Sequence, residues 1–130
     1  MASYEPFTDA DALLAEARLG RPVRGVVGVS WRCPCGGPGV LATRPRLPGG
    51  TPFPTTYYLI CPRAVAAVSR LEATGIMVEM TKRLADDPDL ATSYQRAHER
   101  YLADRADTAV AVGGDVPEIA GFSAGGMPTR

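Results

Sequence analysis

Three cysteines carry the side chains best suited to specific chemistry. Cys33 and Cys35 are separated by one proline, and Cys61 follows a later apolar segment. Thiolates bind soft metal ions, and a structural zinc site takes four protein ligands. His98 is the one histidine in the chain and is therefore the candidate fourth ligand. The sequence predicts a metal site of Cys33, Cys35, Cys61 and His98 that holds zinc, with an iron–sulfur cluster as the alternative.

Other interpretations of these residues stay open. A C-x-C spacing is less specific for metal than paired C-x-x-C motifs, so buried and chemically idle cysteines are one alternative. His98 falls on the apolar face of an expected helix, where a hydrogen-bonded core histidine is the commoner outcome. Cys61 directly precedes another expected helix, whose dipole would lower the pKa of its thiol and favour a nucleophilic thiolate.

Arginines form a second group of candidate residues. Between Ala17 and Leu71 the chain has eight arginines and no acidic residue, whereas acidic flanks bring the net charge to zero. A basic segment attracts anions, and guanidinium groups bind phosphate and carboxylate groups through paired hydrogen bonds. We predict a site for a phosphate-bearing small molecule or a protein partner, with these arginines as its anion-binding residues: Arg32, Arg44, Arg46 and Arg63. The alternative is a solvated surface neutralised by ordinary ion pairs. Nucleic acid is not the expected partner, because aromatic residues on strands are more often core residues.

The elements that would position these residues begin with a helix and a β-hairpin. Thr8 resembles a helix N-cap, and Gly20 closes that helix. Residues 24–32 alternate as in a strand, residues 33–38 contain the turn, and residues 39–43 form the returning strand. The first two cysteines therefore lie in the hairpin turn.

A loop, a third strand and further helices follow. Residues 44–54 contain four prolines and predict a loop, and residues 55–60 are rich in β-branched and aromatic types and predict a strand. Cys61-Pro62 begins a helix, because proline is favoured at the first helical position. The expected helices cover 62–74, 76–85 and a segment that begins at Asp87-Pro88 and loses its apolar pattern after Asp107.

These elements predict one α+β domain over residues 1–130. We expect a small antiparallel sheet of about three strands, a hairpin plus one, packed against three to four helices. Residues 1–7 and 107–130 are expected to be loop or flexible tail. No stretch approaches the roughly 18 consecutive apolar residues of a membrane span, and the N-terminus lacks a signal-peptide pattern, so we expect a cytoplasmic protein.

Several short runs, in their order along the chain, resemble the actinobacterial family called Domain of Unknown Function 501. The resemblance extends from Leu19 onward and rests on these runs: Arg24-Gly-Val-Val-Gly-Val, Arg32-Cys-Pro-Cys-Gly, Gly50-Thr-Pro-Phe-Pro-Thr, Tyr57-Tyr-Leu-Ile-Cys-Pro, Ser69-Arg-Leu-Glu-Ala and Ser123-Ala-Gly-Gly-Met-Pro. It implies a cytoplasmic protein without an established activity, often encoded beside a septum-formation protein and an exopolyphosphatase-like phosphatase. Family members tend to continue into a Lys-Cys-Leu-His segment that this chain lacks. That segment would supply a further cysteine and histidine for the metal.

The leading functional hypothesis is a non-enzymatic accessory module. Its Arg-rich hairpin, rimmed by cysteines, would hold a metal and an anionic ligand or partner. The first alternative is an enzyme that acts on a phosphorylated substrate or through a reactive thiol at Cys61. The second is a protein-interaction adaptor linked to cell division or polyphosphate metabolism.

Overall fold

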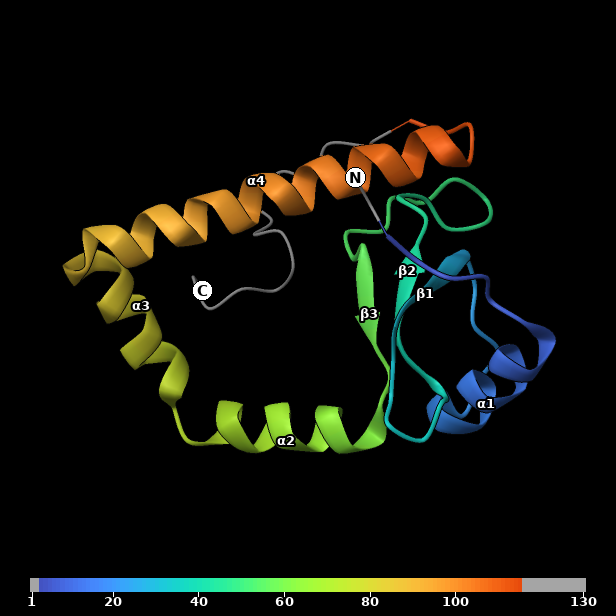
Figure 1. Cartoon of the computed structure of the whole chain (residues 1–130), viewed down its shortest axis with the longest axis horizontal. Coiled ribbons are helices and arrows are strands. Elements are labelled where there is room, and N and C mark those ends of the chain that lie inside the picture. Colours follow the sequence, from blue (N-terminus) through green and yellow to red (C-terminus); the bar gives the residue numbers. More distant parts are fainter. Residues whose placement is uncertain (1–2, 116–130) are drawn as a thin grey trace.

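A three-stranded antiparallel sheet forms one side of the molecule (Figure 1). The computed structural model describes residues 3–115. Within this range, β1 (Val26–Arg32) pairs with β2 (Pro38–Thr43), and β2 pairs with β3 (Tyr57–Leu59). The hairpin plus one strand confirms the predicted sheet, and the four helices of residues 3–115 complete the predicted α+β fold.

Helix α1 (Asp9–Leu19) is held in place by its own capping residues and by β1. The Thr8 hydroxyl accepts a hydrogen bond from the Asp11 amide, and the Asp11 carboxylate accepts one from the Thr8 amide, both at 3.1 Å. Gly20 ends the helix with a left-handed backbone conformation, as predicted. The buried Asp11 carboxylate also pairs with Arg32 of β1 at 2.9 Å. Hydrogen bonds from Arg32 hold the pKa of Asp11 well below its usual range, so this link persists at neutral pH.

The hydrophobic core is small and lies between α1 and the sheet. Its buried members are Ala15 of α1, Val29 of β1, Leu41 of β2 and Ile60 after β3. Register shifts in β1 interrupt the alternation expected along this strand. As a result, Trp31 is 46% exposed although it shares the predicted face of Val29.

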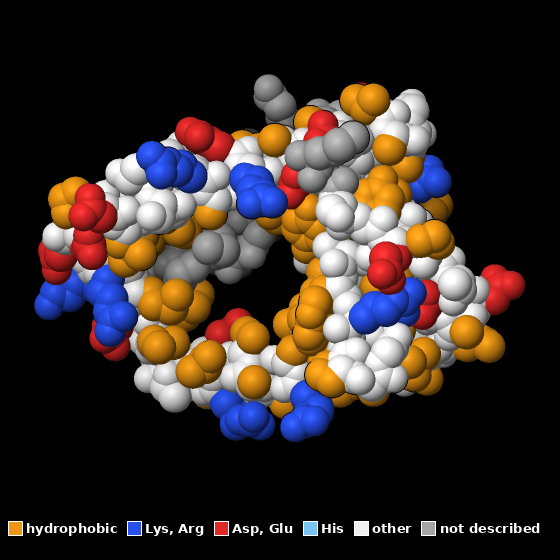
Figure 2. Space-filling view, in the orientation of Figure 1, with side chains coloured by type: hydrophobic (Ala, Val, Ile, Leu, Met, Phe, Trp, Pro, Cys, Tyr) orange, Lys and Arg blue, Asp and Glu red, His pale blue; other side chains and the backbone are white. Residues whose placement is uncertain are grey.

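Helices α2 (Pro62–Ala73), α3 (Ile76–Asp86) and α4 (Pro88–Ala111) form an open ring with the sheet (Figure 1). The chain leaves the sheet along α2, turns through α3 and returns along α4. No residue of α2 or α3 is buried within the described range. Their apolar side chains appear on the inner side of the ring in Figure 2. Only part of the helical half therefore packs on the sheet.

Helix α4 is longer than the sequence predicted. It continues past Asp107 to Ala111, so residues 107–111 are helical rather than the expected loop. Thr108 and Ala109 are buried near its end, because this last part of α4 packs against the proline-rich loop and β3. The remaining expected tail, residues 116–130, lies outside the described residues.

The described part of the expected loop at residues 1–7, residues 3–7, pairs with β1. Glu5 forms an antiparallel bridge with Val29, with 2.8 Å hydrogen bonds in both directions. Among the described residues, no helix is long and apolar enough to cross a membrane.

Candidate functional site

The three cysteines line one open groove between the hairpin turn and the start of α2. Besides Cys33, Cys35 and Cys61, its lining includes Arg18, Trp31, Arg63 and Arg70, and its volume is about 930 Å³. We call this feature the thiol–arginine groove. Its cysteines come together because the Ile60 and Cys61 amides both donate to the Gly39 carbonyl of β2, at 2.8 and 3.1 Å. This pairing brings the start of α2 beside the hairpin.

Arg18, in the last turn of α1, connects the helix to the hairpin turn. Its guanidinium donates to the Cys33 sulfur at 3.4 Å, to the Cys35 sulfur at 3.3 Å and to the Pro38 carbonyl at 2.7 Å. Arg18 was not among the site residues predicted from the sequence. The sequence showed only that Arg18 belongs to the basic segment. A residue at the C-terminal end of a helix has no local feature that indicates which distant turn its side chain will contact.

The three thiols differ in their readiness to ionise. Burial and the neighbouring Cys61 raise the pKa of Cys33. The pKa of Cys35 is lowered mainly by a hydrogen bond from the Gly37 amide and, to a smaller extent, by one from Arg18. The pKa of Cys61 is lowered mainly by a hydrogen bond from the Ala64 amide in the first turn of α2. A hydrogen bond with the Cys33 thiol is the second cause. Cys35 and Cys61 therefore ionise at a lower pH than Cys33.

The structure brings together the three predicted cysteines but not His98. His98 lies on α4 and is half-buried, and it does not line the groove. Within residues 3–115, no three His, Cys, Asp or Glu side chains are arranged to hold a metal ion. The guanidinium of Arg18 instead contacts the sulfurs of both Cys33 and Cys35.

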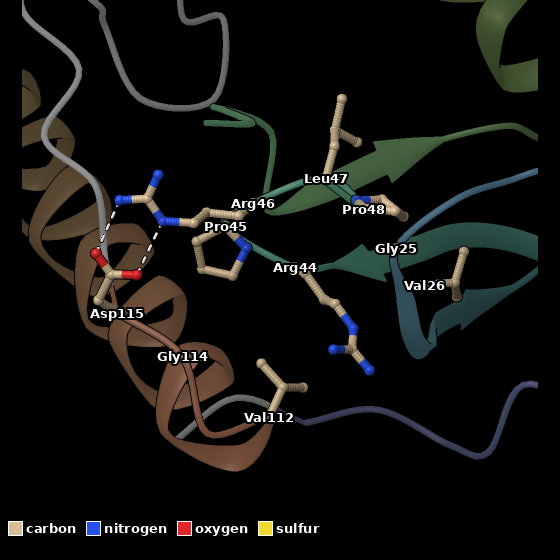
Figure 3. Close-up of a pocket in the computed structure, with 10 residues that line it drawn as sticks. All are labelled: Gly25, Val26, Arg44, Pro45, Arg46, Leu47, Pro48, Val112, Gly114 and Asp115. Atoms are coloured by element: carbon tan, nitrogen blue, oxygen red, sulfur yellow. Dashed lines mark hydrogen bonds and ion pairs between the residues drawn. The ribbon is translucent and has the colours of Figure 1, made fainter. Parts of the chain in front are cut away.

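The four predicted anion-binding arginines lie at three separate places. Arg32 pairs with Glu5 and Asp11, so its main contacts are within the fold. Arg63 lines the thiol–arginine groove. Arg44 and Arg46 line a second cavity (Figure 3).

This second cavity, which we call the loop pocket, lies between the loop after β2 and the end of α4 (Figure 3). It has a volume of about 450 Å³. Arg46 donates from Nε and Nη2 to the two carboxylate oxygens of Asp115, both at 2.8 Å. These hydrogen bonds lower the pKa of Asp115 to about 2, so the pair is charged at neutral pH. Like Arg32, Arg46 therefore already pairs with a carboxylate of the same chain.

A family model described as "Protein of unknown function (DUF501)" matches residues 29–130. The chain therefore belongs to this family, which confirms the family predicted from the short sequence runs. The matched region includes all three cysteines and both arginines of α2, whereas Arg18 precedes it. No curated protein and no solved structure matches the chain.

Proposed function

We propose that this member of the DUF501 family is a binding module that holds a phosphate-bearing anion in the thiol–arginine groove. The observation that carries this proposal is the composition of the groove. Among residues 3–115, its lining contains three arginines, Arg18, Arg63 and Arg70, and no acidic residue. A groove of one charge sign concentrates oppositely charged ligands.

Arg63 and Arg70 are the two arginines available to a ligand. They are seven residues apart on α2, so they share one face of the helix and their Cα atoms are roughly 10 Å apart along its axis. Both side chains are exposed, and neither forms an ion pair with another described residue. Figure 2 shows the basic side chains of α2 on the outer side of the ring. This spacing suits a ligand with an extended anionic part.

Trp31 supplies an aromatic wall to the same groove. Its side chain is 46% exposed, which is unusual for a large aromatic residue on a strand of so small a sheet. Aromatic rings stack on flat groups such as nucleobases, and guanidinium groups bind phosphate oxygens. A ligand that combines phosphate groups with a flat ring would use both features of the groove.

Binding is favoured over catalysis by the surroundings of Cys61. Its lowered pKa favours a thiolate, but the residue is only 5% exposed. Within the part of the chain that the structure describes, the groove lining contains no histidine or carboxylate that could act as a base beside it. A thiol enzyme is therefore the weaker proposal. The other alternative, a protein-interaction adaptor, would use the same arginines to bind an acidic partner.

Titration with ADP and with pyrophosphate at low salt tests the proposal, with the fluorescence of Trp31, the only tryptophan, as one signal. The Arg63→Ala/Arg70→Ala double variant should weaken ADP binding at least tenfold, because each charge-assisted hydrogen bond contributes about 1.5–3 kcal/mol. Added salt should weaken binding further. Pyrophosphate, which lacks the ring, should bind more weakly than ADP.

The matched control is Arg96→Ala/Arg100→Ala, which removes the same charge from exposed positions of α4. This control should leave ADP affinity within about twofold of the unmodified protein, as expected for remote surface charges. Equal losses in both double variants would show nonspecific attraction and contradict the groove. Absence of ADP and pyrophosphate binding at low salt would also contradict it.

A soft metal ion is a second candidate ligand, favoured by the position of Cys33. Its thiol interacts with the thiols of both Cys35 and Cys61, so Cys33 connects the other two cysteines. Zinc binding would require Cys33 to lose its proton and Arg18 to withdraw from the sulfurs. An iron–sulfur cluster would place the same demand on these residues.

Thiol alkylation followed by mass spectrometry, across pH and with or without zinc, separates these possibilities. Without zinc, Cys35 should react first and at a lower pH than an ordinary thiol, because it is exposed and its pKa is lowered. With zinc, all three cysteines should be protected, and Arg18→Ala should strengthen the protection. Equal alkylation of Cys35 with and without zinc would reject the metal site, and fastest reaction at Cys61 would favour the thiol enzyme.

A further inference from the structure

We infer that the loop pocket binds a small organic carboxylate at Arg46, in the place that the Asp115 carboxylate now takes, with Arg44 as a second cation of the pocket. This site is separate from the thiol–arginine groove and does not depend on the function proposed for it. The loop pocket is lined by different elements, namely the start of β1, the loop after β2 and the end of α4.

The loop pocket combines two cations with an apolar wall. Arg44 and Arg46 extend from the same short loop segment, and Figure 3 shows the Arg44 side chain directed away from Asp115. Arg44 is exposed and has no ion-pair partner among residues 3–115. The apolar part of the lining comes from Val26, Leu47, Pro48 and Val112. This composition is typical of sites for small amphipathic anions.

The Arg46–Asp115 pair has the geometry that a bound carboxylate would adopt. Both guanidinium–carboxylate hydrogen bonds measure 2.8 Å, as in a two-point contact. The side chains are 38% and 69% exposed. Exposed ion pairs are weak, so a carboxylate from solution can compete with Asp115 for Arg46.

Arg46 stays in position when Asp115 leaves. Its Nη1 donates to the Gly50 carbonyl at 2.9 Å within the same loop. That loop is in turn held to α4 by buried Arg105, which donates to the Phe53 carbonyl at 2.7 Å. The cation is therefore already oriented for an incoming carboxylate, which lowers the entropic cost of binding.

The charges of the loop pocket favour a monoanion. Asp115 remains attached to the end of α4 after it is displaced, so its negative charge stays close. Two arginines then balance Asp115 and one carboxylate, whereas a phosphate dianion would leave an excess of negative charge. The apolar wall in turn favours a carboxylate with a short hydrocarbon body.

Titration with 3-phenylpropionate, followed by two-dimensional ¹H–¹⁵N NMR of the full chain, tests the inference. The expected result is saturable shifts of the Arg46 Nε–H signal and of the Gly25, Leu47 and Val112 amides. Neutral 3-phenylpropanol should cause much smaller shifts, because it has no charge for the arginines. Phenyl phosphate, the dianionic counterpart, should bind more weakly than 3-phenylpropionate.

Two variants should change the affinity for 3-phenylpropionate in opposite directions. Asp115→Asn should strengthen 3-phenylpropionate binding about fivefold by removing the competing charge, and Arg44→Ala should weaken it by a similar factor. The controls are Asp86→Asn on α3 and Arg96→Ala on α4, which change the same charges far from the loop pocket. Equal affinities of Asp115→Asn and Asp86→Asn would overturn the inference. Absence of loop-pocket shifts in both the unmodified protein and Asp115→Asn would do so too.

Discussion

Replacing Gly39 by alanine is expected to destabilise the protein by about 2 kcal/mol, the usual cost of overpacking a tight site. A Cβ at this position would lie 2.3 and 2.5 Å from two ring carbons of Trp31 and 3.1 Å from the Cys33 sulfur. The Gly39 carbonyl also accepts the hydrogen bonds that hold Ile60 and Cys61. The added methyl group must therefore displace the Trp31 ring or the strand that anchors α2.

Urea denaturation monitored by circular dichroism measures this loss, and the emission maximum of Trp31 reports the displacement of its ring. Gly114→Ala is the control, because a Cβ there would have no neighbour closer than 3.9 Å. Its free energy of unfolding should stay within about 0.5 kcal/mol of the unmodified protein, as for other surface substitutions. Equal stability of the two alanine variants would contradict the close packing described around Gly39.

Replacing Arg105 by methionine is expected to cost about 2–4 kcal/mol, because two backbone carbonyls, one of them in a buried contact, lose a charged donor. Arg105 is only 4% exposed, and burial lowers the pKa of its guanidinium. It donates to the Phe53 carbonyl at 2.7 Å and to the Pro45 carbonyl at 3.5 Å. Methionine fills a similar volume but donates no hydrogen bond. The proline-rich loop should then detach from α4.

The free energy of unfolding and the rate of proteolysis within residues 44–54 both report on this loop. Arg100→Met removes an exposed arginine from the same helix and serves as the control. We expect faster cleavage of the loop only in Arg105→Met. Similar stability and similar cleavage in the two variants would show that Arg105 does not hold the loop.

Local sequence signals predicted most of the secondary structure. Thr8 and Asp11 indicated the start of α1, and both hydrogen bonds of the capping box are present. Pro62 and Pro88 indicated the first turns of α2 and α4, where proline has no amide to leave unpaired. These signals succeed because capping hydrogen bonds and proline sterics involve only residues close in sequence.

Helix α4 shows where such signals fail. Its apolar pattern ends near Asp107, yet the helix continues because Thr108 and Ala109 are buried and the Thr108 hydroxyl donates to the Asp104 carbonyl. Burial against distant segments outweighs the weak local preference of these residues. The end of this helix therefore depended on tertiary packing.

Some features of the candidate site were likewise predictable from the sequence, and others were not. The sequence alone identified the three cysteines, the basic segment and the lowered pKa of Cys61, because these depend on residue type and on the adjacent helix. Only the tertiary structure decided that Arg18 meets Cys33 and Cys35, that Arg32 pairs with Asp11, and that His98 lies outside the groove. The packing of helices and strands determines which charged side chains become partners. The local sequence around residues that are far apart in the chain does not indicate these contacts.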